Sequence, residues 1–470
     1  MVFSSAIFLY WFLPITFLIY FIIPNKKCRN IILTVASILF YAFGQLQYLP
    51  LLLFSVLCNY IFGILLSKQY TNILKRQNII AFAVIVNIGM LCVFKYTDFL
   101  IESLNTILHT HIPTTGIPLP IGISFFTFQG ISYVIDVYRN RTEGTNSFLK
   151  VLLYISFFPQ LIAGPIIKYH DISNEIDNRV CTLKNTAEGL RRFTIGLAKK
   201  LLLSNTVGLV TDSIFELNVV QIDMRLAWLG AVCYVFQIYF DFSGYSDMAI
   251  GLGKVFGFHF KENFNYPYTA DSIKEFWRRW HISLSSWFRD YLYIPLGGNQ
   301  KGKFRTGLNK LIVFFATGFW HGANVTFILW GLFHGLFSVL EQANVIPITK
   351  MKGKVIGHIY TMIIVTIGFV LFRSENLSQA AMMITKMFTI SPVTLESTLL
   401  LRQLLSHYTI FILFICVVAC LGIVPKLYQR GIVTKSVVEC GSYVFAMILL
   451  VLSVIDLSAS TFNPFIYFQF

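Results

Sequence analysis

Charged residues are scarce in this sequence. Only 13% of its 470 residues are Asp, Glu, Lys or Arg, and 56% are hydrophobic, whereas an ordinary soluble domain has about 25% charged residues. This composition excludes a disordered chain, a collagen-like chain and a nucleic-acid-binding protein.

Cysteine pairs and metal motifs are absent as well. The eight cysteines are scattered and form no Cys-x-x-Cys pair, so neither a disulfide framework nor a zinc ribbon is indicated. No His-Glu-x-x-His motif occurs, and we predict no metal site. A repeat of about 20–50 residues is also missing. We therefore expect one membrane domain over residues 1–470.

Long apolar runs are what the sequence has in abundance. They recur from end to end, and a soluble core could not bury them all. We predict an all-α polytopic membrane protein with about ten full spans. The first run is read as a retained span, because no basic residue precedes it and no small-residue cleavage site follows. The expected spans are 3–23, 31–49, 51–66, 78–94, 119–137, 201–217, 226–242, 355–372, 408–424 and 441–457.

The basic residues predict the orientation of these spans. Seven loops hold 32 of the 37 Lys and Arg residues: 24–30, 67–77, 138–150, 168–200, 254–310, 344–354 and 425–435. Placing all seven on the cytoplasmic side follows the positive-inside rule and gives one consistent path. Both chain termini then lie outside.

Two further apolar stretches do not fit simple crossings. Residues 151–167 contain Pro159 and Gly164-Pro165, which would break a straight helix. On the same path, residues 311–341 form a hairpin that turns near Phe319 to Asn324. Broken backbone at membrane depth is tolerated where protein or a wet cavity satisfies it. We therefore expect both stretches to line a tunnel that opens inward.

The first polar cluster lies at the inner end of the 226–242 span. Asp241 and Asp247 stand there among aromatic residues, and acids within a membrane usually face a cavity or a partner. They either line the tunnel or donor site, or pair with Arg278 or Arg279 and fix the packing.

The second cluster, residues 274–298, mixes tryptophan with arginine. Its members include Trp277, Arg278, Arg279 and Arg289. The composition suits a helix in the inner membrane interface, with rings at headgroup level and cations outward. It also suits a vestibule for an anionic donor such as a nucleotide-bearing thioester, because arginine binds phosphate bidentately.

The third cluster, residues 319–335, contains Trp320, His321, Trp330 and His334. An imidazole kept neutral by burial can accept a proton from a hydroxyl nucleophile. If residues 319–335 formed one continuous helix, His321 and His334 would lie about 20 Å apart. If they form a hairpin, the sequence does not determine this distance. A lone apolar histidine is more often structural, but two histidines beside Gly and Trp in a hairpin favour function.

Several long segments together resemble the membrane-bound O-acyltransferase family, in its bacterial alginate and peptidoglycan O-acetyltransferase branch. They are Phe240-Asp-Phe-Ser-Gly-Tyr-Ser-Asp-Met-Ala-Ile-Gly251, Phe276-Trp-Arg-Arg-Trp-His-Ile-Ser-Leu-Ser285, Arg289-Asp-Tyr-Leu-Tyr-Ile-Pro-Leu-Gly-Gly298 and Trp320-His-Gly322. Segments 2–5, 157–165 and 464–470 match as well, so the likeness runs from end to end.

The resemblance implies an acyltransferase of the bacterial cytoplasmic membrane. Acetyl-CoA would be the cytoplasmic donor substrate, with no bound cofactor. A periplasmic SGNH-type acetyltransferase or polysaccharide-modification complex would be the partner, with membrane lipids around the chain and no nucleic acid. By motif position, His321 corresponds to the family's essential histidine and His281 to its second polar position. Val325 stands where many relatives carry Trp, which leaves the acyl-chain preference open.

Two further roles are hypotheses. Asn324 could orient His321 or donate to the developing oxyanion, and Tyr467 could carry the acyl group by likeness to a related D-alanyl transfer system. The alternative for the tail is an aromatic belt anchoring the last helix. At the level of function, a transporter or flippase of a lipid-linked or acyl cargo is the main alternative, and a scaffold that recruits a periplasmic transferase is the second. The acceptor polysaccharide and the oligomeric state stay open.

Overall fold

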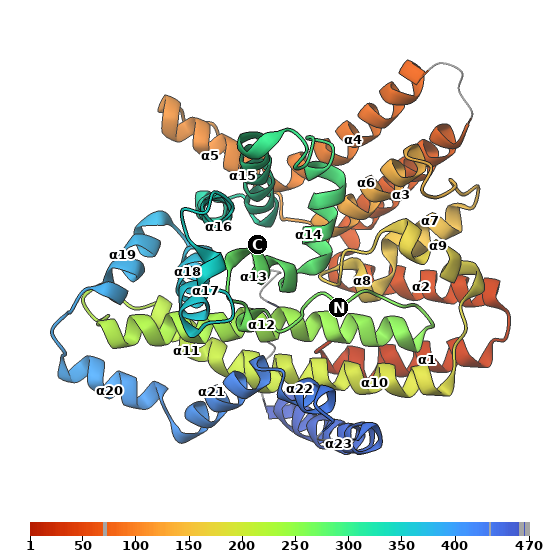
Figure 1. The fold of residues 1–470 in the computed structure, drawn as a ribbon. Coiled ribbons are helices and arrows are strands. Elements are labelled where there is room, and N and C mark those ends of the chain that lie inside the picture. Colours follow the sequence, from red (N-terminus) through yellow and green to blue (C-terminus); the bar gives the residue numbers. More distant parts are fainter. Residues whose placement is uncertain (69–72, 432–433, 460–464, 466–470) are drawn as a thin grey trace. The chain divides into compact units, whose positions relative to one another are not determined.

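The computed structural model describes residues 1–68, 73–431, 434–459 and 465. Every regular element in this part of the chain is helical (Figure 1), which confirms the all-α prediction. The chain divides into two compact units, residues 1–193 with 246–261 and residues 194–245 with 262–470. The expected single domain stays a prediction.

The first unit, called unit 1 below, is built on apolar helices with local start signals. Asn25 caps α2 by accepting hydrogen bonds from the backbone N–H groups of Lys27 and Cys28, and a proline opens α3, where its missing N–H costs nothing. The elements that begin in it are η1 (Phe8–Phe12), α1 (Leu13–Ile22), α2 (Lys26–Gln45), η2 (Leu46–Tyr48), α3 (Leu49–Ser67), α4 (Ile73–Lys95), α5 (Thr97–Leu108), α6 (Ile123–Tyr138), α7 (Phe148–Ser156), α8 (Phe158–Leu161), α9 (Tyr169–Asn178) and α10 (Leu183–Ala198).

The predicted interruption within 151–167 is confirmed. Helix α7 ends at Ser156, the backbone leaves helical geometry at Phe157 (φ −54°, ψ 112°), and α8 lasts only four residues. The whole stretch is buried. Entry and exit of this segment on the cytoplasmic side of the membrane stay a prediction.

The second unit, called unit 2 below, contains the elements after α10 and most of the candidate site residues. These elements are η3 (Lys199–Ser204), α11 (Asn205–Phe215), α12 (Met224–Val255), η4 (Pro267–Thr269), α13 (Ile273–Arg279), α14 (Ile282–Phe288), η5 (Arg289–Tyr293), α15 (Gly302–His321), α16 (Val325–Gln342), α17 (Ile348–Met351), α18 (Val355–Arg373), α19 (Leu377–Phe388), α20 (Leu395–Leu404), α21 (His407–Cys420), α22 (Ile423–Gln429) and α23 (Lys435–Ala459). The last part of α12 belongs to unit 1.

Helices α15 and α16 form the predicted hairpin, which turns at residues 322–324. Glycine lets the two backbones approach closely. A Cβ on Gly318 would lie 2.3 Å from the carbonyl oxygen of Phe327, and one on Gly331 would lie 2.3 Å from that of Phe314. Small residues at a helix–helix interface are typical of membrane proteins.

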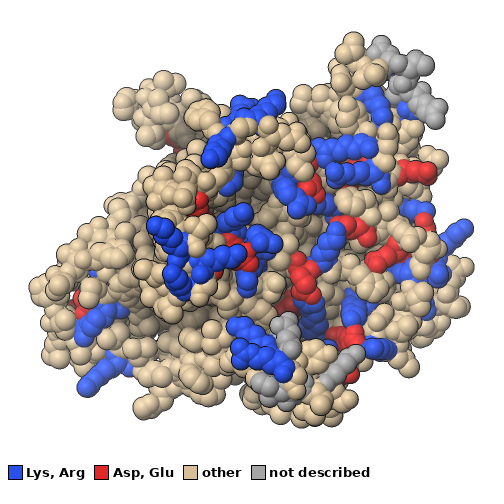
Figure 2. Space-filling model, in the orientation of Figure 1, with Lys and Arg blue, Asp and Glu red and all other residues tan. Residues whose placement is uncertain are grey.

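Seven helical segments of the described chain are long and apolar enough to cross a membrane, and a pair bent by 64° (Leu395–Leu404 with His407–Cys420) would make eight. Expected spans 31–49 and 51–66 fall in one segment, Lys26–Ser67, while the first expected span corresponds to a shorter helix, Phe8–Ile22. Many large apolar side chains are exposed, and wide areas of the face in Figure 2 carry no charge. A multi-pass membrane protein follows, whereas the count of ten spans stays a prediction.

Candidate functional site

His321 is the last residue of α15 and lies buried beside the hairpin turn. Its ring meets the ring of Trp330 at 90° with centroids 5.1 Å apart, and that of Phe372 at 81° and 5.3 Å. Its neighbour Trp320 contributes a third ring at 4.9 Å. The hairpin thus holds the imidazole in an aromatic enclosure contributed by α15, α16 and α18.

His281 lies close to this enclosure. Its φ of 43° is in the left-handed region and separates α13 from α14. Its ring is 4.6 Å from that of Phe242 and 6.3 Å from that of Trp320, and its Nδ1 is 3.1 Å from Oδ1 of Asn263. Burial lowers the pKa of His281 to about 3, because desolvation disfavours the imidazolium. His281 is therefore neutral at physiological pH.

His334 lies on the far side of Trp330, with ring centroids 5.4 Å apart. Trp277 also lies at 5.4 Å from this histidine. In the described part of the chain, both ring nitrogens of His334 and the indole N–H groups of Trp277 and Trp330 are buried without a hydrogen-bond partner. Buried polar groups are normally paired, so these atoms are candidates for contacts with a substrate.

Together these side chains form a row of five rings that we call the histidine–tryptophan row: His281, Trp320, His321, Trp330 and His334. All five are buried within unit 2. The sequence left the distance between His321 and His334 open. In the hairpin the two histidines lie on either side of one indole ring, that of Trp330.

The prediction of a single interfacial helix over 274–298 is wrong. The segment forms three short helices, α13, α14 and η5. Trp280 and Trp287 are buried, and Trp277 packs on the rings of Phe314 and Trp330. The rings therefore belong to the interior of unit 2 and do not form a belt at headgroup level.

The arginines of this segment do point outward. Arg278 pairs with Glu275 at 3.2 Å and keeps 72% of its side chain exposed. Arg279 lies 2.8 Å from the same carboxylate, and Arg289 pairs with Asp290 while 63% exposed. Arg278 and Arg289 thus remain accessible to an anionic group.

The proposed pairing of Asp241 or Asp247 with Arg278 or Arg279 is wrong. Asp241 forms a buried ion pair with Lys200 at 2.5 Å. Asp247 lies in unit 1, where it pairs with Arg192 at 2.8 Å. The cations that pair with both acids, Arg192 and Lys200, come from the basic 168–200 segment. The spacing of these residues in the sequence gave no indication of the pairing.

Asn324 is the N-cap of α16. Its Oδ1 accepts a hydrogen bond from the backbone N–H of Thr326, and its Nδ2 donates to the carbonyl of Glu375 at 2.8 Å. The amide thus tethers the hairpin turn to the chain after α18. The orienting or oxyanion role of Asn324 stays a prediction.

Tyr467 lies outside the described residues. Within the same tail, Phe465 is described and buried, 4.6 Å from the ring of Tyr245 and 4.9 Å from Nζ of Lys200. Phe465 thus contacts α12 at Tyr245 and the cation of the Lys200–Asp241 ion pair. Both readings of Tyr467 remain hypotheses.

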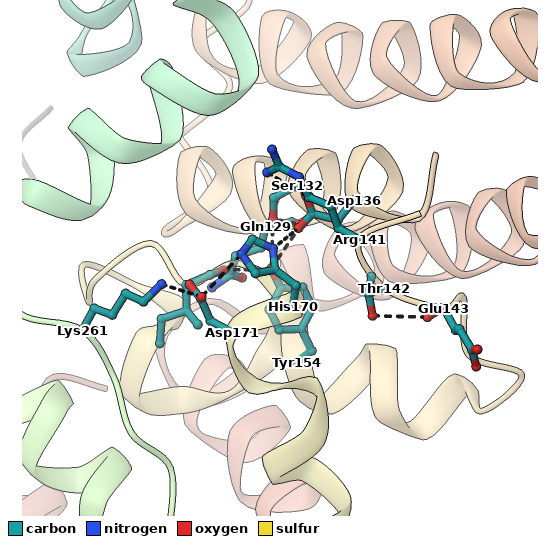
Figure 3. A network of polar contacts seen from close by, with 11 residues as sticks. Gln129, Ser132, Asp136, Arg141, Thr142, Glu143, Tyr154, His170, Asp171 and Lys261 are labelled. Carbon is teal, nitrogen blue, oxygen red and sulfur yellow. Dashed lines mark hydrogen bonds and ion pairs between the residues drawn. The ribbon is translucent and has the colours of Figure 1, made fainter. Parts of the chain in front are cut away.

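A polar cluster in unit 1 was missed by the sequence reading (Figure 3). Nδ1 of His170 lies 2.7 Å from Oδ2 of the fully buried Asp136, and Nε2 of His170 lies 3.4 Å from Asp171. Lys261 in turn pairs with Asp171. The sequence did contain an indication of this cluster. Asp136 is an acid inside the expected 119–137 span, and acids within a membrane usually have a partner. His170 joins α9 to α6.

Within the described residues, no three His, Cys, Asp or Glu side chains are placed to hold a metal ion. The structure thus defines a class: an all-α, multi-pass membrane protein that buries three histidines among tryptophans in one helical unit.

Comparison with known proteins defines the family. The family model "MBOAT, membrane-bound O-acyltransferase family" matches residues 139–377. The chain is 40% identical to the probable alginate O-acetylase AlgI of Pseudomonas putida and 39% identical to that of Azotobacter vinelandii, over the full length of each chain. It is 34% identical to the peptidoglycan O-acetyltransferase of Helicobacter pylori, covering all of this chain and 98% of that protein.

The chain belongs to the membrane-bound O-acyltransferase family and is an O-acyltransferase. The resemblance noted in the sequence is confirmed. The matched region contains the whole histidine–tryptophan row.

Proposed function

We propose that this protein transfers an acetyl group from acetyl-CoA on the cytoplasmic side to a hydroxyl group on the outer side of the cytoplasmic membrane. The group serves O-acetylation of an extracytoplasmic polysaccharide, through a periplasmic SGNH-type partner. The names of the relatives, an alginate O-acetylase and a peptidoglycan O-acetyltransferase, support acetyl as the group and a glycan as the final acceptor. The basic loops support an orientation with both termini outside.

The observation that carries the proposal is the buried position of His321 in the middle of the histidine–tryptophan row. In the proposed reaction, the aromatic walls limit access of water to the imidazole, and burial of this kind favours the neutral, proton-accepting form of a histidine. A thioester within such an enclosure is protected from hydrolysis.

In the proposed step, His321 accepts the proton of the acceptor hydroxyl as its oxygen attacks the thioester carbonyl. The new C–O bond forms, the C–S bond breaks, and the proton passes from the imidazolium to the departing CoA thiolate. Because a thioester is already activated, alignment of the two reactants supplies much of the rate. Neutral His281 is available to hydrogen-bond the reacting groups.

The exposed guanidinium groups of Arg278 and Arg289 are suited to the phosphates of the donor. Guanidinium groups bind phosphate in a bidentate manner, and the charge count puts this segment on the cytoplasmic side. The charged face of α13 and η5 therefore suits a donor entrance.

The test is CoA release from acetyl-CoA by purified protein in detergent, with His321→Ala compared with wild type. Loss of a general base predicts a decrease of about 10²- to 10⁴-fold. His407→Ala is the matched control, because His407 is an exposed histidine of the same unit. Normal release by His321→Ala would refute catalysis and favour a transporter of an acyl cargo.

A further inference from the structure

Arg179 is a buried cation in unit 1. It directly follows α9, and only 5% of the residue is exposed. Its Nε donates to the hydroxyl of Tyr20 at 3.0 Å. Its Nη1 donates to Oδ1 of Asn30 at 2.6 Å and to the carbonyl of Ile176 at 2.9 Å. Its Nη2 is buried without a hydrogen-bond partner in the described chain. Because buried donors are normally paired, this guanidinium has capacity for one more acceptor.

The charge of Arg179 has no carboxylate partner among the described residues. All three groups that accept its hydrogen bonds are uncharged: a phenol, an amide and a backbone carbonyl. The carbonyl end of α9 offers only about half an elementary charge. The three acids of α9 each bind another basic side chain: Asp171 binds Lys261, Glu175 binds His259 and Asp177 binds Lys150. A net positive charge therefore remains in the interior of unit 1.

A second arginine brings its charge to the same place. The guanidinium carbon of Arg29 lies 5.0 Å from the ring centroid of Tyr20, and that of Arg179 lies 5.8 Å from it. Arg29 is only partly buried, and within the described chain its side chain donates to a backbone carbonyl, that of Ile23, and not to an acid. Two uncompensated cations beside one aromatic ring create a positive potential that attracts an anion.

The site is predicted to lie at the cytoplasmic surface of the membrane. Arg29, Arg179 and Phe258 come from three of the basic segments that the positive-inside rule places on that side. The ring of Phe258 lies 4.7 Å from the guanidinium carbon of Arg179. Tyr20 lies near the end of α1, the first apolar helix of the chain. Phospholipid headgroups are available at this level of the membrane.

The face of α1 next to the site favours a lipid over a soluble anion. Leu18, Ile19 and Ile22 are exposed and lie within one turn of Tyr20. Exposed apolar side chains on a membrane helix contact the acyl chains of lipids. A phospholipid bound at the arginines would continue along this face, whereas a soluble phosphate compound such as CoA would gain nothing from it.

We propose that Arg179 and Arg29 bind the phosphate group of an anionic phospholipid at the cytoplasmic surface of unit 1. A phosphate oxygen accepts a hydrogen bond from Nη2 of Arg179, and the negative charge compensates the two guanidinium groups. Because Arg29 is only partly buried, its side chain can move to admit the headgroup. The histidine–tryptophan row belongs to unit 2, so the lipid stabilises unit 1 and takes no part in acyl transfer.

The test is lipid binding to the purified full-length protein in mild detergent, measured by native mass spectrometry. The probes are phosphatidylglycerol, phosphatidylcholine with the same acyl chains, and CoA as a soluble source of phosphate. We expect phosphatidylglycerol to bind about 10-fold more tightly than phosphatidylcholine, because the choline cation cancels the charge of the phosphate. An excess of CoA should not displace the bound phosphatidylglycerol.

Arg179→Gln should weaken phosphatidylglycerol binding about 10-fold, and Arg29→Gln about 3-fold. Arg141→Gln is the matched control. Arg141 is an exposed arginine of the same unit and the same predicted side, but Asp136 lies 3.9 Å from it. This control removes the same charge and should bind the lipid normally. Added phosphatidylglycerol should raise the Tm of the wild type and of Arg141→Gln more than that of Arg179→Gln.

Equal affinity for the two phospholipids, or unchanged phosphatidylglycerol affinity in Arg179→Gln, would overturn the proposal. If Arg179→Gln does not fold, unchanged affinity in Arg29→Gln would overturn it instead. Displacement of phosphatidylglycerol by CoA would refute a lipid as the occupant and favour a soluble phosphate compound. An equal loss of affinity in Arg141→Gln would show that net charge, and not this site, attracts the lipid.

Discussion

Replacing Gly331 by alanine tests whether the close packing of α15 and α16 positions His321. The new Cβ would lie 2.3 Å from the carbonyl oxygen of Phe314, whereas real Cβ contacts essentially never fall below 3.0 Å. The opposing group is backbone and cannot rotate away. The two helices must therefore separate by about 1 Å.

The expected consequence falls on activity more than on stability. Overpacking costs about 1–3 kcal/mol, and alanine returns about 1 kcal/mol through its helix propensity. A misplacement of about 1 Å can lower a reaction rate about 10²-fold. Because Gly331 follows Trp330, the ring against His321, we expect Gly331→Ala to lose about 10²-fold in acyl transfer.

Gly307→Ala is the matched control in the same hairpin. Its Cβ would lie 3.5 Å from the side chain of Val339, an ordinary contact, so the variant should be slightly stabilised and fully active. Gly318→Ala meets the carbonyl of Phe327 at 2.3 Å and should resemble Gly331→Ala. The assay is CoA release with thermal unfolding in detergent. A fully active Gly331→Ala protein, or an equally damaged Gly307→Ala protein, would refute the reasoning.

Two further predictions concern buried ionisable groups. The pKa of His281 falls from about 6.5 in the unfolded chain to about 3 in the folded one, so the unfolding free energy should be complete above pH 6.5 and fall as the pH drops from 6.5 toward 3. At pH 5 the free energy of unfolding should be about 2 kcal/mol lower than above pH 6.5. In thermal unfolding, His281→Gln should reduce this decrease at acidic pH. A variant that loses as much stability as the wild type would contradict the low pKa of His281. Lys200→Met removes the buried cation that pairs with Asp241 and should lower the free energy of unfolding by about 3–5 kcal/mol. Adding Asp241→Leu should recover most of this, and a double variant as unstable as Lys200→Met would show that the charge is not the cause.

The membrane class and several helices follow directly from local sequence. Runs of apolar residues predicted α4, α18 and α23, because the length of an apolar helix must match the bilayer. Proline and glycine predicted the interruption after α7, because they act locally on the backbone. The turn near His321 was predicted from the charge-based path of the chain through the membrane. Long motifs were enough to identify the family.

The partners of polar side chains could not be predicted in the same way. Sequence spacing suggested arginines of the 274–298 segment for Asp241, but the partner is Lys200 from η3. The same segment looked amphipathic as a single helix, yet the left-handed backbone at His281 breaks it and turns its tryptophans inward. Both errors arise because packing between distant segments decides which groups meet.

The amino-acid sequence alone determined that this chain is a helical membrane O-acyltransferase with a histidine at a helix break, since hydropathy, breaks and motifs are properties of contiguous residues. Only the tertiary structure decided that Trp320 and Trp330 separate three buried histidines, and that Lys200 of η3 pairs with Asp241 of α12. Those arrangements depend on close approach between helices far apart in the chain, which contiguous residues do not encode.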